Sequence, residues 1–249
     1  MLRLGLVSIT FRTLSPGDVV NLVRAAGLDG IEWGGDVHAP HGDVERAAKV
    51  KDLTLSAGLS VAAYGSYYRA GEKDAVPFAD VLASAAAMAA PVIRIWAGKK
   101  GSADACPEYR RQVVEACRSA AATAADMNIG VACEFHGNTL TDTPQSTLHL
   151  LEEVDHPNFL TYWQPAVGAD VSRRFESLKL LSPHLSNVHV FHWHGVQRLP
   201  LSAGDGEWRQ YLQHIRSLDG DRYAMIEFVA DDRPENFMSD AAILKSWLA

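Results

Sequence analysis

The fold is constrained most by a regular alternation of short β-rich runs with longer helical segments along the whole chain. The runs are rich in branched and aromatic residues, and the segments between them are rich in alanine and leucine with charges at helical spacing. Eight runs in 249 residues give one repeat per about 31 residues, the spacing of a (β/α)8 or TIM barrel. The predicted strands are 2–8, 30–33, 59–65, 91–97, 129–135, 159–164, 187–193 and 223–229.

The segments between the runs carry the end signals of helices. Ser15 followed by Pro16 predicts an N-cap and a first helical position, and Gly27 stands where a C-cap glycine belongs. Asp43 and Pro107 predict the starts of two further helices. Each predicted helix leads into a strand, which is the pattern of repeated βαβ units.

The chain has no internal boundary. No serine- or glycine-rich linker divides it, so we expect one α/β domain over residues 1–249. A doubly wound open sheet is the structural alternative, but it would usually have fewer strands and a glycine-rich phosphate turn after the first. The stretch after the first run reads ITFRTLSPGD and lacks that turn.

Charge and composition limit the kinds of molecule that this protein is expected to bind. The net charge of −7 disfavours nucleic acid and anionic membranes, which attract basic faces. The first residues lack the features of a secretory signal, and the most apolar window, ASAAAMAAPVI, is too short to span a membrane, so we expect a cytoplasmic protein. Cys106, Cys117 and Cys133 match no zinc or redox spacing and are interpreted as reduced thiols.

Polar side chains collect at the ends of the predicted strands, where barrels form their active sites. Glu134, His189 and Glu227 lie on predicted strands five, seven and eight, and Gln164 on strand six. Two carboxylates with an imidazole can hold one divalent ion such as Mn²⁺, Mg²⁺, Zn²⁺, Fe²⁺ or Co²⁺. The alternative is that each of these side chains is satisfied separately, by an arginine or by backbone.

Aromatic and basic side chains form a second group at the strand ends. Trp33, Trp96, Trp163 and Trp193 could pack against a sugar ring, which favours a carbohydrate ligand, although packing at the barrel rim would also explain them. Six basic residues could hold a phosphate or pair with surface carboxylates. They are Arg12, Arg69, Arg94, Lys99, Lys100 and Arg198.

These residues lie in segments that resemble the sugar phosphate isomerase/epimerase family, the xylose-isomerase-like TIM barrels. The segments are GLDGIEW, AGLSVAAYGSYYR, CEFHGN, NVHV and MIEF, and their order spans nearly the whole chain. The resemblance implies a metal held by Glu134, His189 and Glu227, with Gln164 where the family usually has an aspartate. Val167 likewise stands where a histidine is common. Because Gln164 brings no negative charge, we expect weaker metal binding. Endonuclease IV, a member with three metals, is disfavoured because its additional histidines are missing.

The resemblance implies proton transfer next to a carbonyl, with the metal stabilising an enediolate and with Glu134 and Glu227 as acid/base pair. We therefore expect a metal-dependent isomerase or epimerase that acts on a sugar or sugar phosphate. The alternatives are an inosose-dehydratase-like lyase and, because Gln164 replaces the usual aspartate, a catalytically inert sugar-binding barrel. Association into homo-oligomers also remains open. The predicted substrate-binding residues are Glu32, Trp33, Tyr64, Arg94, Trp96, His136, Trp163, His192, Trp193 and Arg198.

Overall fold

Eight parallel strands close into a barrel in the order β1-β10-β7-β6-β5-β4-β3-β2. The computed structural model describes residues 1–248. Each barrel strand overlaps one of the eight predicted runs, so the barrel prediction is confirmed. The strands are β1 (Leu2–Val7), β2 (Gly30–Gly34), β3 (Ser60–Arg69), β4 (Val92–Trp96), β5 (Gly130–Cys133), β6 (Phe159–Trp163), β7 (Leu185–Val190) and β10 (Arg222–Ile226).

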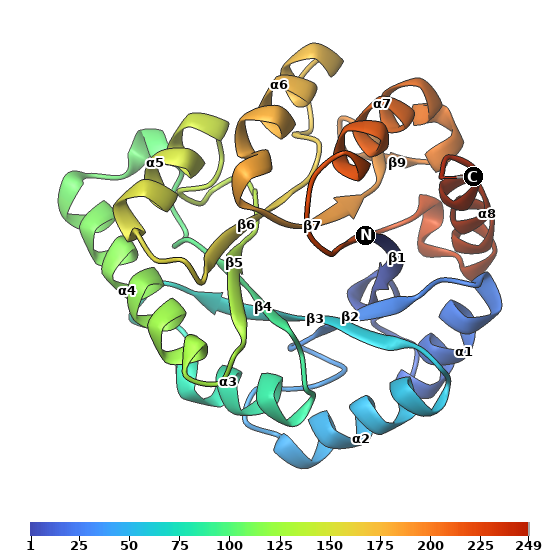
Figure 1. The fold of residues 1–249 in the computed structure, drawn as a ribbon, viewed down its shortest axis with the longest axis horizontal. Coiled ribbons are helices and arrows are strands. Elements are labelled where there is room, and N and C mark those ends of the chain that lie inside the picture. Colours follow the sequence, from blue (N-terminus) through green and yellow to red (C-terminus); the bar gives the residue numbers. More distant parts are fainter. Residues whose placement is uncertain (249) are drawn as a thin grey trace.

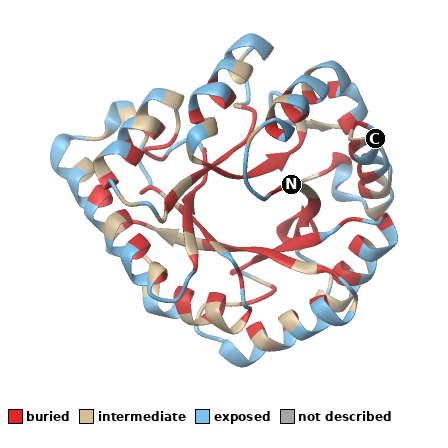
Figure 2. Ribbon diagram, in the orientation of Figure 1, coloured by how far each residue is buried: buried red, intermediate tan, exposed pale blue. Residues whose placement is uncertain are grey.

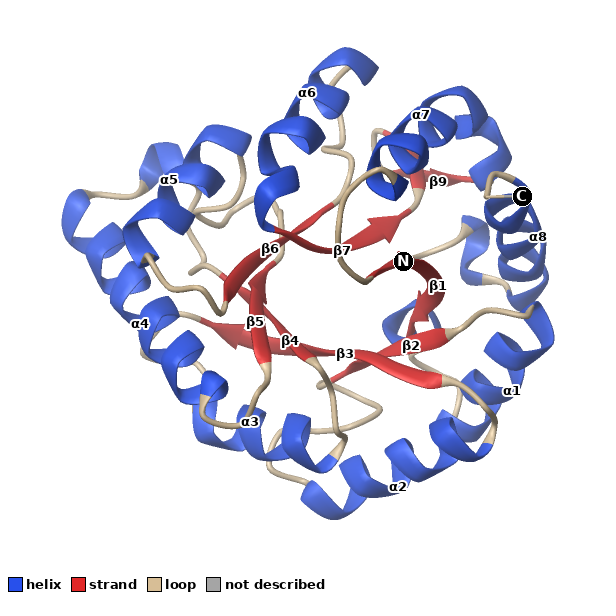
Figure 3. Ribbon diagram, viewed as in Figure 1, coloured by secondary structure: helices blue, strands red, loops and turns tan. Residues whose placement is uncertain are grey.

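Helices surround the barrel as an outer layer, each following a strand in the chain (Figure 1). Figure 3 shows this ring of helices around the ring of strands. No helix within residues 1–248 combines the length and apolarity that crossing a bilayer requires. The helices are α1 (Pro16–Ala26), α2 (Val44–Ser56), α3 (Phe78–Ala87), α4 (Pro107–Ala125), α5 (Pro144–Val154), α6 (Val171–Leu181), α7 (Asp205–Arg216) and α8 (Pro234–Ser246).

The predicted helix ends have the expected geometry. The Ser15 hydroxyl accepts a hydrogen bond from the Asp18 amide at 3.2 Å, which caps the start of α1. Gly27 ends that helix with a φ of 66°, a left-handed conformation that glycine adopts without a steric cost. The Asp43 carboxylate caps α2, and α4 begins at Pro107.

Two apolar layers hold the barrel. Figure 2 shows buried residues along the strands and on the inner sides of the helices, with exposed residues on the outer helix faces. The smaller cluster includes Ala132, Tyr162 and Met225 and packs within the barrel, whereas the larger one lies between strands and helices. Successive residues of a strand point to opposite layers, so adjacent residues have different surroundings.

One strand prediction differs from the structure. The run 187–193 divides at Val190, where β7 ends its pairing with β10, and a short antiparallel hairpin follows. The hairpin comprises β8 (His192–His194) and β9 (Gln197–Leu199), joined at Gly195, whose φ of 56° suits a tight turn. His192 and Trp193 therefore lie on this hairpin and not on a barrel strand.

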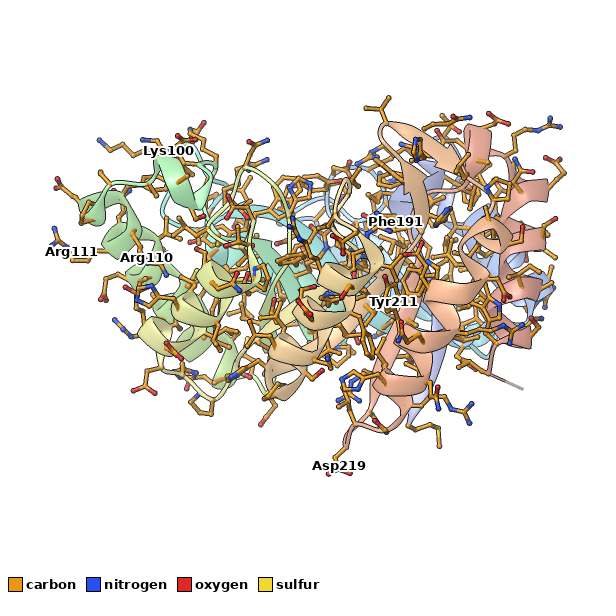
Figure 4. All side chains as sticks on the ribbon, turned by 90° about the horizontal axis from the view of Figure 1, so that it is seen from above. Lys100, Arg110, Arg111, Phe191, Tyr211 and Asp219 are labelled. Atoms are coloured by element: carbon orange, nitrogen blue, oxygen red, sulfur yellow. The ribbon has the colours of Figure 1, made fainter. Side chains whose placement is uncertain are left out.

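The two ends of the barrel differ in what they carry. In the side view of Figure 4, Lys100, from the loop after β4, lies at one end, and Asp219, from the turn before β10, lies at the other. Phe191, which directly follows β7, lies toward the end that carries Lys100. This is the end where the strands finish.

Candidate active site

A pocket of about 440 Å³ opens at the carboxyl ends of the strands. This volume falls within the range of small-molecule sites. Side chains from the segments that follow five of the eight barrel strands, together with residues of β3 and β4, line it. They include Ile9, Arg12, Tyr67, Arg94, Trp96, Glu134, Phe135, His136, Asp142, Gln164, Val167, Phe191, Trp193, Glu227 and Phe228.

Three side chains with the right atoms for a metal meet in this region. Glu134, His189 and Glu227 are all buried, and their ligand atoms lie within 4.8 Å of one another. The Nδ1 atom of His189 is 3.3 Å from Glu227 Oε2 and 3.7 Å from Glu134 Oε1. The strand ends thus bring together the three residues that the sequence singled out.

Gln164 completes this set. It follows β6 directly, lines the pocket, and its Oε1 lies 3.1 Å from His189 Nδ1. Three side-chain oxygens therefore surround one ring nitrogen of His189. An amide oxygen can ligate a metal but brings no charge, so the set has two negative charges from Glu134 and Glu227.

The donor set fits a divalent ion. It offers one imidazole nitrogen, two carboxylates and an amide oxygen, a mixture that first-row divalent metals accept. Buried carboxylates at this separation repel each other unless a positive charge lies between or beside them. The residues that could hold the ion are Glu134, Gln164, His189 and Glu227.

The Glu134 carboxylate is held by donors on one side. Its Oε2 accepts hydrogen bonds from the Arg94 guanidinium and, at 2.5 Å, from the Trp96 indole, which leaves Oε1 facing His189. Burial alone would raise the pKa of Glu134, but the charges of Arg94 and His189 outweigh it and hold that pKa well below its usual range. Glu134 is therefore an ionised carboxylate and a weak proton acceptor.

Glu32 lies behind the ligand set, with no exposed surface. Its Oε1 accepts from Arg94 Nε at 2.7 Å, and its Oε2 lies 3.4 Å from His189 Nε2. Burial opposes its charge, but Arg94 and His189 lower the pKa of Glu32. The same carboxylates raise the pKa of the buried Arg94 guanidinium and of the His189 ring, against the effect of burial.

An aromatic wall borders one side of the pocket. The Trp96 ring lies 5.5 Å from His136 and 5.3 Å from Tyr67, and the Arg69 guanidinium stacks on it at 4.0 Å. The Tyr67 hydroxyl accepts from Arg12, and burial raises the pKa of Tyr67 to about 12. This wall is flat and apolar, with charged groups at its edge.

The hairpin contributes the opposite wall. The Trp193 ring lies 5.9 Å from Phe228, and the Arg198 guanidinium stacks on Phe228 at 4.2 Å and on Trp193 at 5.3 Å. Arg198 also pairs with Asp232. Arg198 thus connects the hairpin to the segment that follows Glu227.

Four residues expected to contact substrate lie elsewhere. Trp33 donates to Thr54 at 3.1 Å and Trp163 donates to Ser177 at 2.9 Å, so both indoles point outward to the helices. The other two are Tyr64, which bonds to His41 and to the Ala39 carbonyl, and His192, which pairs with Glu207 at 2.9 Å. None of the four is among the pocket-lining residues of the described chain, and neither are Glu32 and Arg198, two further predicted substrate-binding residues.

Several pocket residues were not among the predicted substrate-binding residues. Arg12 lies in the loop after β1, and Tyr67 lies near the end of β3. Phe135, Phe191 and Phe228 follow β5, β7 and β10, the strands that carry or precede the clustered residues. The signal for the last three is proximity in sequence, because each stands one or two residues after Glu134, His189 or Glu227.

Comparison with known proteins places the chain in a family. A family model described as the xylose isomerase-like TIM barrel matches residues 20–247. The 3-dehydroshikimate dehydratase of Bacillus anthracis is 31% identical over 281 residues, covering 98% of this chain and 96% of that protein.

Solved structures agree on the fold. The structure of a probable 3-DHS dehydratase, AsbF, from Bacillus anthracis matches with a TM-score of 0.82 and 24% identity over 98% of each chain. The D-psicose 3-epimerase of Clostridium cellulolyticum H10 matches with a TM-score of 0.69 and 14% identity over 99% of this chain and 96% of that chain. The chain belongs to the xylose isomerase-like TIM-barrel family.

Proposed function

We propose that this protein is a metal-dependent dehydratase that removes water from a small hydroxylated ketone, with 3-dehydroshikimate as the first substrate to test. The observation that carries the proposal is the cluster of Glu134, His189 and Glu227 at the pocket. The 31% identity to a 3-dehydroshikimate dehydratase over nearly the whole chain supports loss of water as the reaction. The aromatic pocket walls suit a compact carbon ring.

The residues that would hold the ion are Glu134, Gln164, His189 and Glu227. A divalent ion held there would supply Lewis acidity to a ketone oxygen and would lower the free energy of the enolate that forms when the neighbouring proton leaves. Mn²⁺, Fe²⁺, Co²⁺ and Zn²⁺ accept a mixed nitrogen and oxygen set more readily than Mg²⁺, which prefers oxygen.

Glu227 is the proposed base. It lines the pocket, and its carboxylate pairs with His189 through Oε2. Glu134 is the weaker candidate because Arg94 and Trp96 both donate to it and keep it ionised. In the proposed step Glu227 takes the proton from the carbon beside the ketone, and the electron pair of that C–H bond moves onto the ketone oxygen.

His136 is the proposed donor to the departing hydroxyl. It lines the pocket and lies against Trp96, and its Nδ1 is 2.6 Å from the Gly137 carbonyl. A carbonyl only accepts, so Nδ1 carries a proton and Nε2 is the atom that gains or loses one. When the enolate returns its electron pair, the adjacent C–O bond breaks and the hydroxyl leaves as water with the proton from Nε2.

Isomerisation or epimerisation is the second candidate, because two carboxylates lie at the same pocket. If Glu134 returns a proton to the opposite face of the carbon, the carbon inverts and no water leaves. Deuterium exchange with solvent, without loss of water, would distinguish this reaction. Because Gln164 weakens the proposed metal set, a third candidate is a sugar-binding barrel without catalysis. This candidate predicts sugar binding with neither deuterium exchange nor loss of water.

The test uses the purified full chain, loaded in turn with each divalent ion. Loss of water from 3-dehydroshikimate yields an aromatic dihydroxybenzoate, so turnover appears as a rise in near-ultraviolet absorbance. We expect metal-dependent turnover that Glu227→Gln and Glu134→Gln each abolish, and that the control Glu153→Gln retains, since Glu153 pairs with Arg110 on the outer helices. Metal-independent turnover, or full activity of Glu227→Gln, would contradict the proposed mechanism.

A further inference from the structure

We infer that Glu32 is a positioning residue for the proposed metal centre, which fixes His189 directly and Glu134 through Arg94. This inference rests on the proposed function, because it assumes that the cluster of Glu134, His189 and Glu227 binds a metal ion. Glu32 comes from β2, on the far side of the barrel from β7. Glu32 is not itself a pocket-lining residue, and it hydrogen-bonds to Arg94, which is one.

The contacts form a closed ring of four buried side chains. Glu32 Oε1 accepts from Arg94 Nε at 2.7 Å, and the other end of that guanidinium donates to Glu134 Oε2. Glu134 Oε1 faces His189 Nδ1 at 3.7 Å, and His189 Nε2 returns to Glu32 Oε2 at 3.4 Å. Each oxygen of Glu32 thus serves one ligand of the cluster.

The contact between Glu32 and His189 determines which nitrogen of His189 faces the metal. Oxygen atoms that only accept hydrogen bonds face both ring nitrogens of His189, but only the nitrogen beside Glu32 Oε2 points away from the other proposed ligands and keeps its proton when an ion is bound. That nitrogen is Nε2, which leaves Nδ1, the atom beside Gln164, Glu227 and Glu134, as the ligand. A carboxylate behind a ligating imidazole fixes the ring and makes the ligand nitrogen more basic.

The contact between Glu32 and Arg94 determines which oxygen of Glu134 is free. Arg94 has several donors, and its Nε is taken by Glu32. With Nε occupied, the guanidinium approaches Glu134 from one side and bonds to Oε2 alone, together with Trp96. Without Glu32, the guanidinium could form a two-pronged pair with Glu134 and cover the oxygen that faces His189.

The packing around the ring is an independent observation. Gly65 in β3 lies beside it, and a Cβ atom at that position would lie 2.7 Å from Glu32 Oε1 and 2.9 Å from Arg94 Nη2. Both distances are below those that real Cβ atoms adopt. The barrel therefore keeps space for this pair of side chains, and a methyl group would displace it without changing any charge.

The test measures metal affinity in the full chain. Apo protein is titrated with Mn²⁺ and with Zn²⁺ in competition with a chromophoric chelator. Glu32→Gln should weaken binding by about 10- to 100-fold, the usual effect of removing a carboxylate behind a ligating histidine. Gly65→Ala should weaken it in the same direction. The control Glu207→Gln removes a carboxylate from His192, outside the cluster, and should leave affinity within about twofold of wild type.

A second readout needs no variant and separates positioning from general stabilisation. Nitrogen-15 NMR of histidine-labelled, zinc-loaded wild type should show zinc on Nδ1 of His189 and a proton on Nε2. Unchanged affinity in Glu32→Gln, or zinc on Nε2, would overturn the inference while metal-dependent dehydration by the wild type stands. If the wild type binds neither ion, the proposed function and this inference fail together.

Discussion

Arg94 is the buried cation on which two carboxylates depend, and replacing it with glutamine gives the most direct test of the site's electrostatics. Its guanidinium is 1% exposed and donates to both Glu32 and Glu134. Arg94→Gln removes the positive charge but leaves both carboxylates buried. We expect the metal-free variant to be much less stable than the metal-free wild type.

The magnitude follows from the burial. Removing one partner from a buried, hydrogen-bonded ion pair costs about 3–5 kcal/mol, because the remaining charge stays without compensation. For a chain of this size, 1 kcal/mol corresponds to about 2–4 °C in Tm, so the expected fall is about 6–20 °C. A divalent ion brings positive charge to Glu134, and Mn²⁺ should therefore raise the Tm of the variant by more than it raises that of wild type.

Differential scanning calorimetry in chelator, and again in excess Mn²⁺, measures both effects. Arg222→Gln is the matched control, since Arg222 is also buried but donates to the backbone carbonyls of Ile215, Leu218 and Asp219. Arg222→Gln should lower the Tm, and Mn²⁺ should raise the Tm of this variant no more than it raises that of wild type. A fall in Tm below about 2 °C for Arg94→Gln, or equal recovery in both variants, would refute the argument.

Three further changes have defined outcomes. Gln164→Asp adds a negative charge beside His189 and should tighten Mn²⁺ binding by about tenfold, measured by isothermal titration calorimetry. Burial raises the pKa of Asp240 to about 6, so the stability that its protonated form contributes below about pH 4 is lost as the pH rises through 6. In urea unfolding, Asp240→Asn should therefore raise the free energy of unfolding by up to about 3 kcal/mol at pH 8 and leave it unchanged at pH 4. An equal gain at both pH values would exclude this cause. Trp163→Ala should cost about 3–5 kcal/mol in the same assay yet leave ligand affinity unchanged, whereas weaker ligand binding would place Trp163 at the site.

The barrel could be predicted because its signals are local and repeated. Each strand is a short β-rich run, and the caps at Ser15, Gly27 and Asp43 are formed by residues within one turn of the helix end. The cluster of Glu134, His189 and Glu227 followed from the same logic, since parallel strands finish at one face.

The direction of individual side chains was harder to predict. Glu32 and Gln164 point inward, so Trp33 and Trp163, each one residue away along the chain, must point outward to the helices. Assigning residues to strand ends without this alternation placed both tryptophans in the pocket. The period of two, applied strand by strand, would have excluded them.

Individual pairings between distant segments, beyond the shared face at which the strands finish, could not be predicted. The hairpin after Val190 depends on where β7 stops pairing with β10, which neither segment encodes alone. The bond from Glu32 to Arg94 joins residues on β2 and β4, and no local pattern reports it. Such pairings are decided by tertiary packing.

Closure of the barrel through β1 and β10 has a consequence for synthesis on the ribosome. Leu2–Leu6 of β1 pair with Arg222–Ile226 of β10. One edge of β1 therefore stays uncovered until β10, the last barrel strand, has been synthesised. Until then β1 has only β2 beside it, and its open edge can pair with other chains or recruit a chaperone. Glu227 follows that last strand directly, so a nascent chain cannot assemble the cluster before the barrel itself is ready to close.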